Sequence, residues 1–195
     1  TLSPRRLSPK LFMAGVVQTK THGPGLYEAS RLVPYNCWKN ASRSHDFFIR
    51  QTETVTVSVN PWEIEPPVDP YPYERHASMC VVPEGKIGSY GHRATNALML
   101  GCVPLITKEL YSYPILHEAI DWRAISLHVP PAQMPQLLGI LANTSVESLR
   151  AAAAPMRRRL LWTSIYGTCH LRAGEGGAAD AFDTLMRVLA SPRRH

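Results

Sequence analysis

Long hydrophobic runs are absent from this sequence of 195 residues. A helix that crosses a bilayer needs about 20 consecutive, mostly apolar residues, and no stretch here approaches that length. The sequence therefore predicts no membrane span within this chain. Basic residues interleaved with aromatic residues, the pattern of RNA-binding domains, are absent as well, so nucleic acid is not an expected partner.

Cysteine is scarce, and the four residues are Cys37, Cys80, Cys102 and Cys169. Their spacing does not match that of metal ligands, so we expect no metal site. Free cysteine is commonly a core residue, and Cys80 and Cys102 each fall in a predicted strand, which favours buried thiols. A disulfide is the alternative for a chain in an oxidising compartment, and the sequence leaves its pairing open.

Positive charge exceeds negative charge, with 21 Lys and Arg against 15 Asp and Glu, a formal net charge of +6 and a pI of about 9.3. A basic surface attracts phosphate groups or acidic polysaccharides. Much of the excess comes from two arginine runs, at 157–159 and 193–194. Such runs are more typical of a solvated face than of a binding site.

The most informative stretch is 77–106. An apolar run at 79–83 is followed by a polar, Gly-rich loop at 84–91, a segment of small residues at 92–100, and a second apolar run at 102–106. This order predicts a strand, a loop, a helix and a strand. Two buried strands joined through a helix predict a parallel pair with a right-handed crossover.

The loop of this unit has the composition of a phosphate site. In open α/β sheets, ligands bind beyond the carboxyl ends of the strands, where this loop and the start of the next helix would lie. Gly85, Gly88 and Gly91 would let backbone N–H groups approach a phosphate, and Arg93 would add a permanent, bidentate positive charge. Gly-rich loops are also common as plain turns, and Arg93 could instead pair with Glu84 or Glu109.

The segments before this unit predict further strands and a helix. Residues 10–17 form a short apolar strand, residues 26–38 have helical spacing, and alternating Thr and Val within 47–60 predict a strand with one polar face. Pro34 should end or kink the helix near its middle. Residues 61–73 contain five prolines and predict an irregular surface loop.

The segments after it predict the remaining elements. We expect a short helix ending near Ile120, a strand at 122–129, and a helix that begins at Pro130-Pro131, since proline is tolerated in a first helical turn. Together with the central unit, these elements predict an α/β fold class: a Rossmann-like parallel sheet of about four to six strands, flanked by helices.

Two more helices are expected near the end of the chain. Thr144-Ser145-Val146-Glu147 matches a capping box at the start of the first, and Pro155 should kink that helix. Glycines at 174–177 interrupt the chain before a last amphipathic helix at 178–189.

The order of the central parts resembles the donor-binding half of the exostosin-type glycosyltransferases, an inverting family with the GT-B fold. In that family a Ser-x-Phe-Cys-Leu-x-Pro-x-Gly segment precedes a polar loop ending in Arg, and Gly-Cys-Ile/Val-Pro-Val/Leu-Ile follows. The corresponding residues here are Ser78 to Gly85, Arg93, and Gly101 to Ile106. Leu11 to Gly15 is similar to the strand that opens the same half-domain. The resemblance covers about residues 9–170.

The resemblance implies a donor site around the Gly-rich loop and the helix that follows it. Arg93 would hold the diphosphate of a nucleotide sugar and stabilise the charge of the leaving group. Many relatives carry a carboxylate where this chain has Asn96, which can still form hydrogen bonds to ribose hydroxyls but lacks the charge. The candidate donor-binding residues are Gly15, Gly88, Ser89, Tyr90, Gly91, His92, Arg93 and Asn96.

The implied activity is the transfer of a hexose or pentose from a nucleotide sugar, expected to be UDP-linked, to a polysaccharide or glycoprotein acceptor with inversion. The catalytic base would lie outside this chain. The lack of an Asp-x-Asp tripeptide fits a mechanism without a metal, and no cofactor is expected. The alternatives are a non-catalytic partner subunit of a homologous transferase and an unrelated Rossmann-like nucleotide-binding module.

The resemblance also divides the chain. Residues 1–9 would be a linker from a missing N-terminal half, residues 10–170 a donor-binding domain, and residues 171–195 a C-terminal loop and helix. Such a protein would act on the lumenal side of the Golgi membrane. Two tripeptides, Asn40-Ala41-Ser42 and Asn143-Thr144-Ser145, would suit a glycoprotein of that pathway, although such tripeptides also arise by chance.

Overall fold

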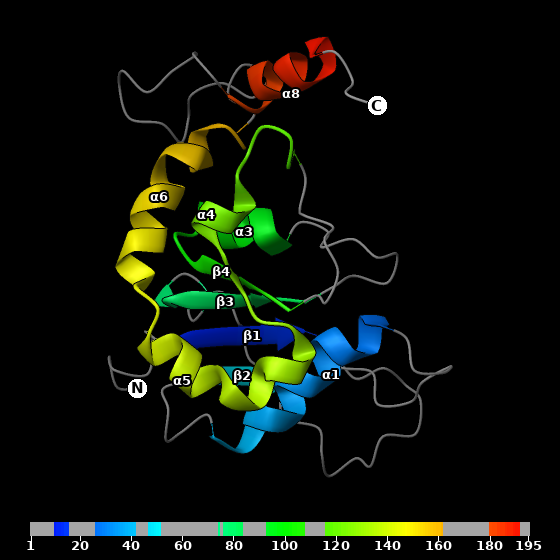
Figure 1. The fold of residues 1–195 in the computed structure, drawn as a ribbon, viewed down its shortest axis with the longest axis vertical. Coiled ribbons are helices and arrows are strands. Elements are labelled where there is room, and N and C mark those ends of the chain that lie inside the picture. Colours follow the sequence, from blue (N-terminus) through cyan, green and yellow to red (C-terminus); the bar gives the residue numbers. More distant parts are fainter. Residues whose placement is uncertain are drawn as a thin grey trace.

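A parallel sheet forms the centre of the molecule. The computed structural model describes residues 10–15, 26–41, 47–51, 74, 76–83, 93–107, 116–161 and 180–191. Within them lies a five-stranded sheet in the order β2-β1-β3-β4-β5, with every pair parallel (Figure 1). The strands are β1 (Leu11–Gly15), β2 (Phe47–Gln51), β3 (Met79–Val82), β4 (Val103–Ile106) and β5 (Leu127–His128). The predicted class, a Rossmann-like α/β fold, is confirmed.

Helices lie on both faces of this sheet (Figure 1). The α-helices are α1 (Leu26–Trp38), α3 (Arg93–Met99), α4 (Trp122–Ile125), α5 (Leu137–Ala142), α6 (Val146–Arg158) and α8 (Ala181–Ala190). The described residues also include the 3-10 helices η2 (Lys39–Ala41), between α1 and β2, and η4 (Pro131–Gln136), between β5 and α5. The predicted strand continuation at 52–60, the Pro-rich loop at 61–73 and the linker at 1–9 lie outside the described residues.

Residues of the central strands alternate between two buried clusters. In β3, Met79 and Val81 belong to one cluster, and Cys80 and Val82 belong to the other. All four side chains are buried. A strand covered on both faces needs apolar residues at every position, which explains why the sequence of β3 is an uninterrupted apolar run.

The first face of the sheet is covered by α1, η4 and α5. Trp38, at the end of α1, is buried, and its ring packs edge-to-face against Phe47 of β2 at 5.7 Å between centroids. Its indole Nε1–H donates a hydrogen bond to the Met134 carbonyl at 3.1 Å. This pairing joins α1 to η4 and satisfies the one polar atom of a large buried side chain.

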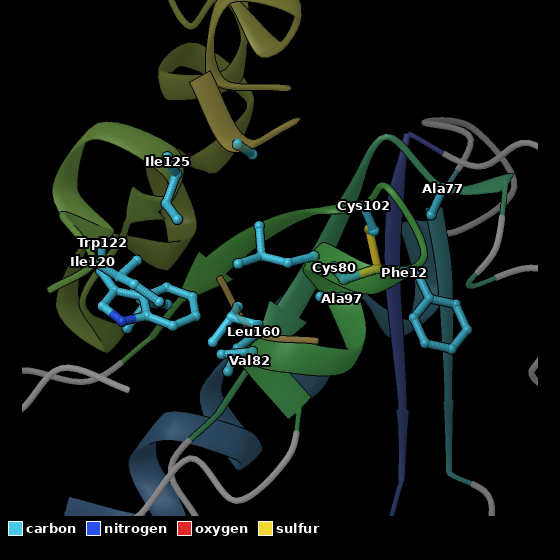
Figure 2. Packing of buried hydrophobic residues seen from close by; sticks show 14 residues of the cluster. Phe12, Ala77, Cys80, Val82, Ala97, Cys102, Ile120, Trp122, Ile125 and Leu160 are labelled. Atoms are coloured by element: carbon cyan, nitrogen blue, oxygen red, sulfur yellow. A yellow bond between two sulfur atoms is a disulfide. The ribbon is translucent and has the colours of Figure 1, made fainter. Parts of the chain in front are cut away.

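The second face is covered by α3, α4 and α6. Figure 2 shows Trp122 and Ile125 of α4 turned toward the same apolar cluster as Val82 and Ala97. Trp122 is 1% exposed, and it is the largest of the fully buried side chains in the described residues. On the sheet itself, Phe12 stacks on Phe48 with the ring centroids 5.4 Å apart.

Helix α6 passes from one face of the sheet to the other (Figure 1). Its first turns contribute Val146 and Leu149 to the cluster beneath α5, and its later turns contribute Ala153 and Met156 to the cluster beneath α3 and α4. One helix therefore connects both apolar layers.

Helix α3 ends in a Schellman motif centred on Gly101. The N–H of Gly101 donates to the Leu98 carbonyl at 3.0 Å, and the N–H of Cys102 donates to the Ala97 carbonyl at 2.9 Å. Gly101 has a φ of +80°, in the left-handed region that this motif requires and that glycine adopts most easily. This motif ends α3 at Met99 and allows the chain to enter β4 at Val103.

A disulfide joins the two central strands. Cys80 in β3 and Cys102 immediately before β4 are bonded, with their Cα atoms 5.8 Å apart (Figure 2). Both residues are buried, as predicted, but the expectation of free thiols is wrong. Parallel pairing places residue 80 opposite residue 104, and the Cα atom of Cys102, just before β4, lies at a distance from that of Cys80 that suits a disulfide. Cys37 is an exposed free thiol, and Cys169 lies outside the described residues.

The strand predicted at 122–129 is wrong in its first half. Residues Trp122–Ile125 form the short helix α4, and only Leu127–His128 pair with β4. The Asp121 side chain caps the helix by accepting hydrogen bonds from the N–H groups of Arg123 and Ala124. Trp122 and Ile125 are three residues apart, so the turn buries both on one side.

Two other expectations about helix ends need correction. The first turn of α6 is capped by Ser145, whose hydroxyl accepts from the Ser148 N–H at 3.3 Å. Thr144, predicted as the cap, donates its hydroxyl to the Ile140 carbonyl instead. Of the two effects predicted for Pro34, ending α1 is wrong, since the helix continues to Trp38; a kink at Pro34 stays a prediction.

We predict opposite effects for the same substitution at two glycines. Gly101→Ala should lower the free energy of unfolding by about 1–2 kcal/mol, because alanine is strained at a positive φ. Gly139→Ala, inside α5, should raise it by up to about 1 kcal/mol, because alanine is the better helix former. An added Cβ would meet nothing within 4 Å at either site. A steric clash therefore does not contribute to the difference in unfolding free energy between the two variants. Urea denaturation measures both, and a stabilising Gly101→Ala would contradict the left-handed cap.

We also predict that removing the disulfide destabilises the fold. The bond closes a loop with a sequence separation of 22, for which the loss of unfolded-state entropy contributes about 3 kcal/mol. The double variant Cys80→Ala with Cys102→Ala should lose about 2–4 kcal/mol of unfolding free energy in urea. The control is Cys37→Ser at the exposed thiol. Equal stability of the double variant and the wild type would show that the bond is absent.

Candidate functional site

The strands all end at one edge of the sheet, which we name the carboxyl edge. There β1 ends at Gly15, β3 at Val82 and β4 at Ile106. The strand after β1 pairs on one side of it and β3 pairs on the other, so the direction of winding reverses between β1 and β3. Ligands of open α/β sheets bind at such a reversal, beyond the carboxyl ends of the strands. The ends of β1 and β3 therefore mark the candidate site.

Arg93 is placed at this edge by the connection between β3 and β4. Both strands are parallel, so α3 must run from the carboxyl edge back to the start of β4, and Arg93 is its first residue. Ala94, Ala97 and Leu98 are buried toward the sheet, and the Arg93 side chain is left half-buried. A permanently charged guanidinium thus stands at the end of the central strands.

Asn96 shares a helix face with Arg93, since residues three apart are neighbours on a helix surface. Its side chain is exposed, so it can form hydrogen bonds with a ligand held by Arg93. Of the predicted donor-binding residues, these two are brought together by the described structure. Gly15 closes β1 at the same edge.

Thr107 adds a polar residue that the sequence analysis did not single out as a ligand. It directly follows β4, its exposed fraction is 0%, and its N–H donates to the Val82 carbonyl at 3.4 Å. Of the loop at 107–113 that follows β4, Thr107 is the only described residue. A buried threonine at a strand end gives little sequence signal, because threonine is also common inside strands.

Glu74 is a second residue that the sequence analysis missed. Burial raises the pKa of its carboxyl group, and the positive charge of Arg93 opposes that rise. Glu74 is half-buried and precedes β3, whereas Arg93 follows it. Their mutual influence arises from the fold, and no local pattern in the sequence relates the two residues.

The other predicted donor-binding residues lie outside the described part of the chain. These residues are Gly88, Ser89, Tyr90, Gly91 and His92. Their role in binding a donor therefore stays a prediction.

Three arginines of α6 and its end donate hydrogen bonds to backbone carbonyls of other elements. Arg150 donates to the Gly101 carbonyl at 3.2 Å and to the Ser78 carbonyl at 3.5 Å, where β4 and β3 begin. We name this edge of the sheet the amino edge. Arg150 therefore holds the starts of both central strands to α6.

The predicted solvated face at 157–159 is wrong for two of its three members. Arg157 donates to the Met99 carbonyl at the end of α3, and Arg159 donates to the Ala119 carbonyl at 3.2 Å. Both side chains are half-buried, whereas Arg158 is exposed. Guanidinium groups commonly satisfy carbonyls left open at helix ends. Arg158 is consequently a suitable control for surface charge.

Metal sites and membrane spans can be assessed over the described ranges. There, no three His, Cys, Asp or Glu side chains lie close enough together to hold a metal ion. None of the helices in these ranges has the length and apolar character needed to cross a bilayer. A comparison of the chain with models of known protein families finds no match.

We predict a pH dependence from Glu74. With its pKa raised in the fold, this group contributes most to stability below the ordinary carboxyl pKa of 4.5, and the contribution is lost as pH rises through the higher folded value. Glu74→Gln cannot ionise. Its free energy of unfolding, relative to wild type, should therefore increase as pH rises from the acid range to neutrality.

Urea denaturation at a series of pH values measures this difference. Glu147→Gln, at an exposed carboxylate in the first turn of α6, separates the local effect from the general loss of one negative charge. A Glu74→Gln difference that is constant or falls with pH would contradict the assigned burial cost.

Proposed function

We propose that this chain is the donor-binding half of an inverting glycosyltransferase of the GT-B type, similar to the exostosin family. It binds a nucleotide sugar, with UDP as the expected nucleotide. The sugar is transferred to a polysaccharide or glycoprotein acceptor.

The observation that carries this proposal is the position of Arg93. The Arg of the family-like motif stands at the first turn of α3, at the carboxyl edge, beside the reversal between β1 and β3. The two motif segments around it, Ser78 to Gly85 and Gly101 to Ile106, supply the adjacent central strands β3 and β4. The order of motif parts and the order of structural parts support the same site.

Arg93 has the chemistry that a diphosphate requires. Guanidinium groups bind phosphate oxygens through two parallel N–H···O bonds, and they keep their charge at every physiological pH. The same fixed charge would stabilise the nucleoside diphosphate as it leaves, because charge develops there in the transition state. The half-buried environment of Arg93 strengthens that interaction over one in bulk water.

The rest of the reaction is assigned to parts outside this chain. The catalytic base is proposed to come from the acceptor-binding half, and transfer proceeds without a metal. The setting is the lumenal side of the Golgi membrane. The buried Cys80–Cys102 disulfide supports an oxidising compartment, since such bonds are rare in cytosolic proteins.

A second candidate function is a non-catalytic subunit that supports a homologous transferase. The observation that favours it is Asn96, which occupies the exposed face beside Arg93 where many relatives carry a carboxylate. An amide can accept and donate hydrogen bonds to ribose, but weaker binding of the nucleotide follows from the lost charge. Such a subunit would keep the fold and bind nucleotide poorly.

Calorimetric titration of the full-length protein with UDP and with GDP tests the site. Loss of one partner of a buried charge pair costs roughly 2–5 kcal/mol, so Arg93→Ala should bind UDP about 30-fold more weakly or worse. Arg93→Lys should recover only part of the affinity, because an ammonium group cannot reproduce the bidentate contact. Arg158→Ala, an exposed arginine, should bind as wild type does.

The outcomes distinguish the candidates. Equal UDP affinity in wild type and Arg93→Ala would remove Arg93 from the site. No measurable binding of either nucleotide by the folded wild-type protein would reject the transferase and favour the non-catalytic subunit.

A further inference from the structure

Both Asn-x-Ser/Thr tripeptides of the chain present their asparagine at the surface. These are Asn40-Ala41-Ser42 and Asn143-Thr144-Ser145. The side chains of Asn40 in η2 and Asn143 after α5 are both exposed. An asparagine in such a tripeptide can accept an N-linked glycan only where the folded protein leaves room for it.

The two asparagines lie at the same edge of the sheet. Helix α1 starts after β1 ends and leads back toward the start of β2, so Asn40, in η2 at its far end, approaches the amino edge; η2 contacts β2. Asn143 lies between α5 and α6, which follow one another at the same end of the sheet (Figure 1). The Arg150 side chain of α6 bonds to carbonyls at the starts of β3 and β4. The candidate site lies at the opposite, carboxyl edge.

The local geometry at Asn143 tolerates a glycan. Its Nδ2 donates one hydrogen bond to the Gly139 carbonyl at 2.9 Å. An unmodified amide nitrogen carries two hydrogens, so a glycosylated one keeps a hydrogen for this bond. In the folded protein, the Ser145 hydroxyl caps α6. The turn can therefore form whether or not the asparagine is modified.

The disulfide independently indicates that the protein folds in the secretory pathway, where N-glycans are added. Cys80 and Cys102 are 2% and 1% exposed, so their bond is part of the core and not a surface oxidation. Structural disulfides form in the secretory pathway and are rare in the cytosol. The same pathway gives access to the oligosaccharide donor.

We infer that Asn143 and Asn40 are N-glycosylation sites and that their glycans project from the amino edge. The co-reactant is an oligosaccharide linked to a lipid through a diphosphate. A bond forms between the sugar C1 and the asparagine Nδ2, the bond from C1 to the diphosphate oxygen breaks, and the amide nitrogen gives up one proton. The inference rests on exposure and compartment, and it stands apart from the proposed transferase activity.

The test is peptide mapping by mass spectrometry of the natural full-length protein expressed in a eukaryotic cell. Enzymatic deglycosylation in heavy-oxygen water converts each occupied asparagine to a labelled aspartate. We expect the label at Asn143 and Asn40. Asn143→Gln and Asn40→Gln should each remove one glycan from the intact mass. Asn36→Gln, at an exposed asparagine of α1 outside any such tripeptide, should remove none.

The results decide the inference directly. Unlabelled peptides at both positions would overturn it, as would an intact mass that is unchanged in the Asn143→Gln and Asn40→Gln variants. Nucleotide binding by the unglycosylated protein would still be measurable, so failure here is distinguishable from failure of the proposed function.

Discussion

The parallel pairing of β3 with β4 is the constraint on which the rest of the structure depends. Both strands are buried on both faces, and parallel neighbours can be joined only by a crossover. That crossover is α3, which must start at the carboxyl edge and end at the amino edge. The position of Arg93 at its first turn and the left-handed Gly101 at its end both follow from this requirement. The Cys80–Cys102 disulfide then fixes the two strands covalently.

The two edges of the sheet consequently differ in character. At the amino edge, Arg150 satisfies backbone carbonyls where β3 and β4 begin, and Arg157 satisfies one at the end of α3, so this edge is tied to α6. At the carboxyl edge, the half-buried Arg93 and the exposed Asn96 occupy one helix face. This division suits a protein in which one edge is structural and the other binds a ligand.

The sequence was sufficient to predict the centre of the fold. The apolar runs at 79–83 and 102–106 are uninterrupted and have the length of strands that are buried on both faces, and the parallel pairing of these strands is confirmed. The placement of Arg93 at the carboxyl edge follows from the same pattern. The general α/β class and the helix at 26–38 follow from spacing, and helix α6 follows from the capping-box pattern near its start.

Other features were missed for two reasons: an ambiguous local composition in one case, and contacts between distant residues in the rest. Trp122 and Ile125 fit a strand as well as a helix by composition, and the Asp121 cap decides for the helix. The arginines at 157 and 159 look solvated in sequence because their acceptors are carbonyls of other elements. The influence of Arg93 on Glu74, and the pairing of Cys80 with Cys102, likewise exist only once the strands are assembled.

The central claim is that a ligand binds at the carboxyl edge between β1 and β3. Backbone amide chemical shifts of the isotope-labelled protein, followed while UDP is added, test it most directly. The account predicts shifts at Gly15, Arg93 and Thr107, with Gly101 and Arg150 unchanged. Shifts gathered at Gly101 and Arg150, with none at the carboxyl edge, would contradict it.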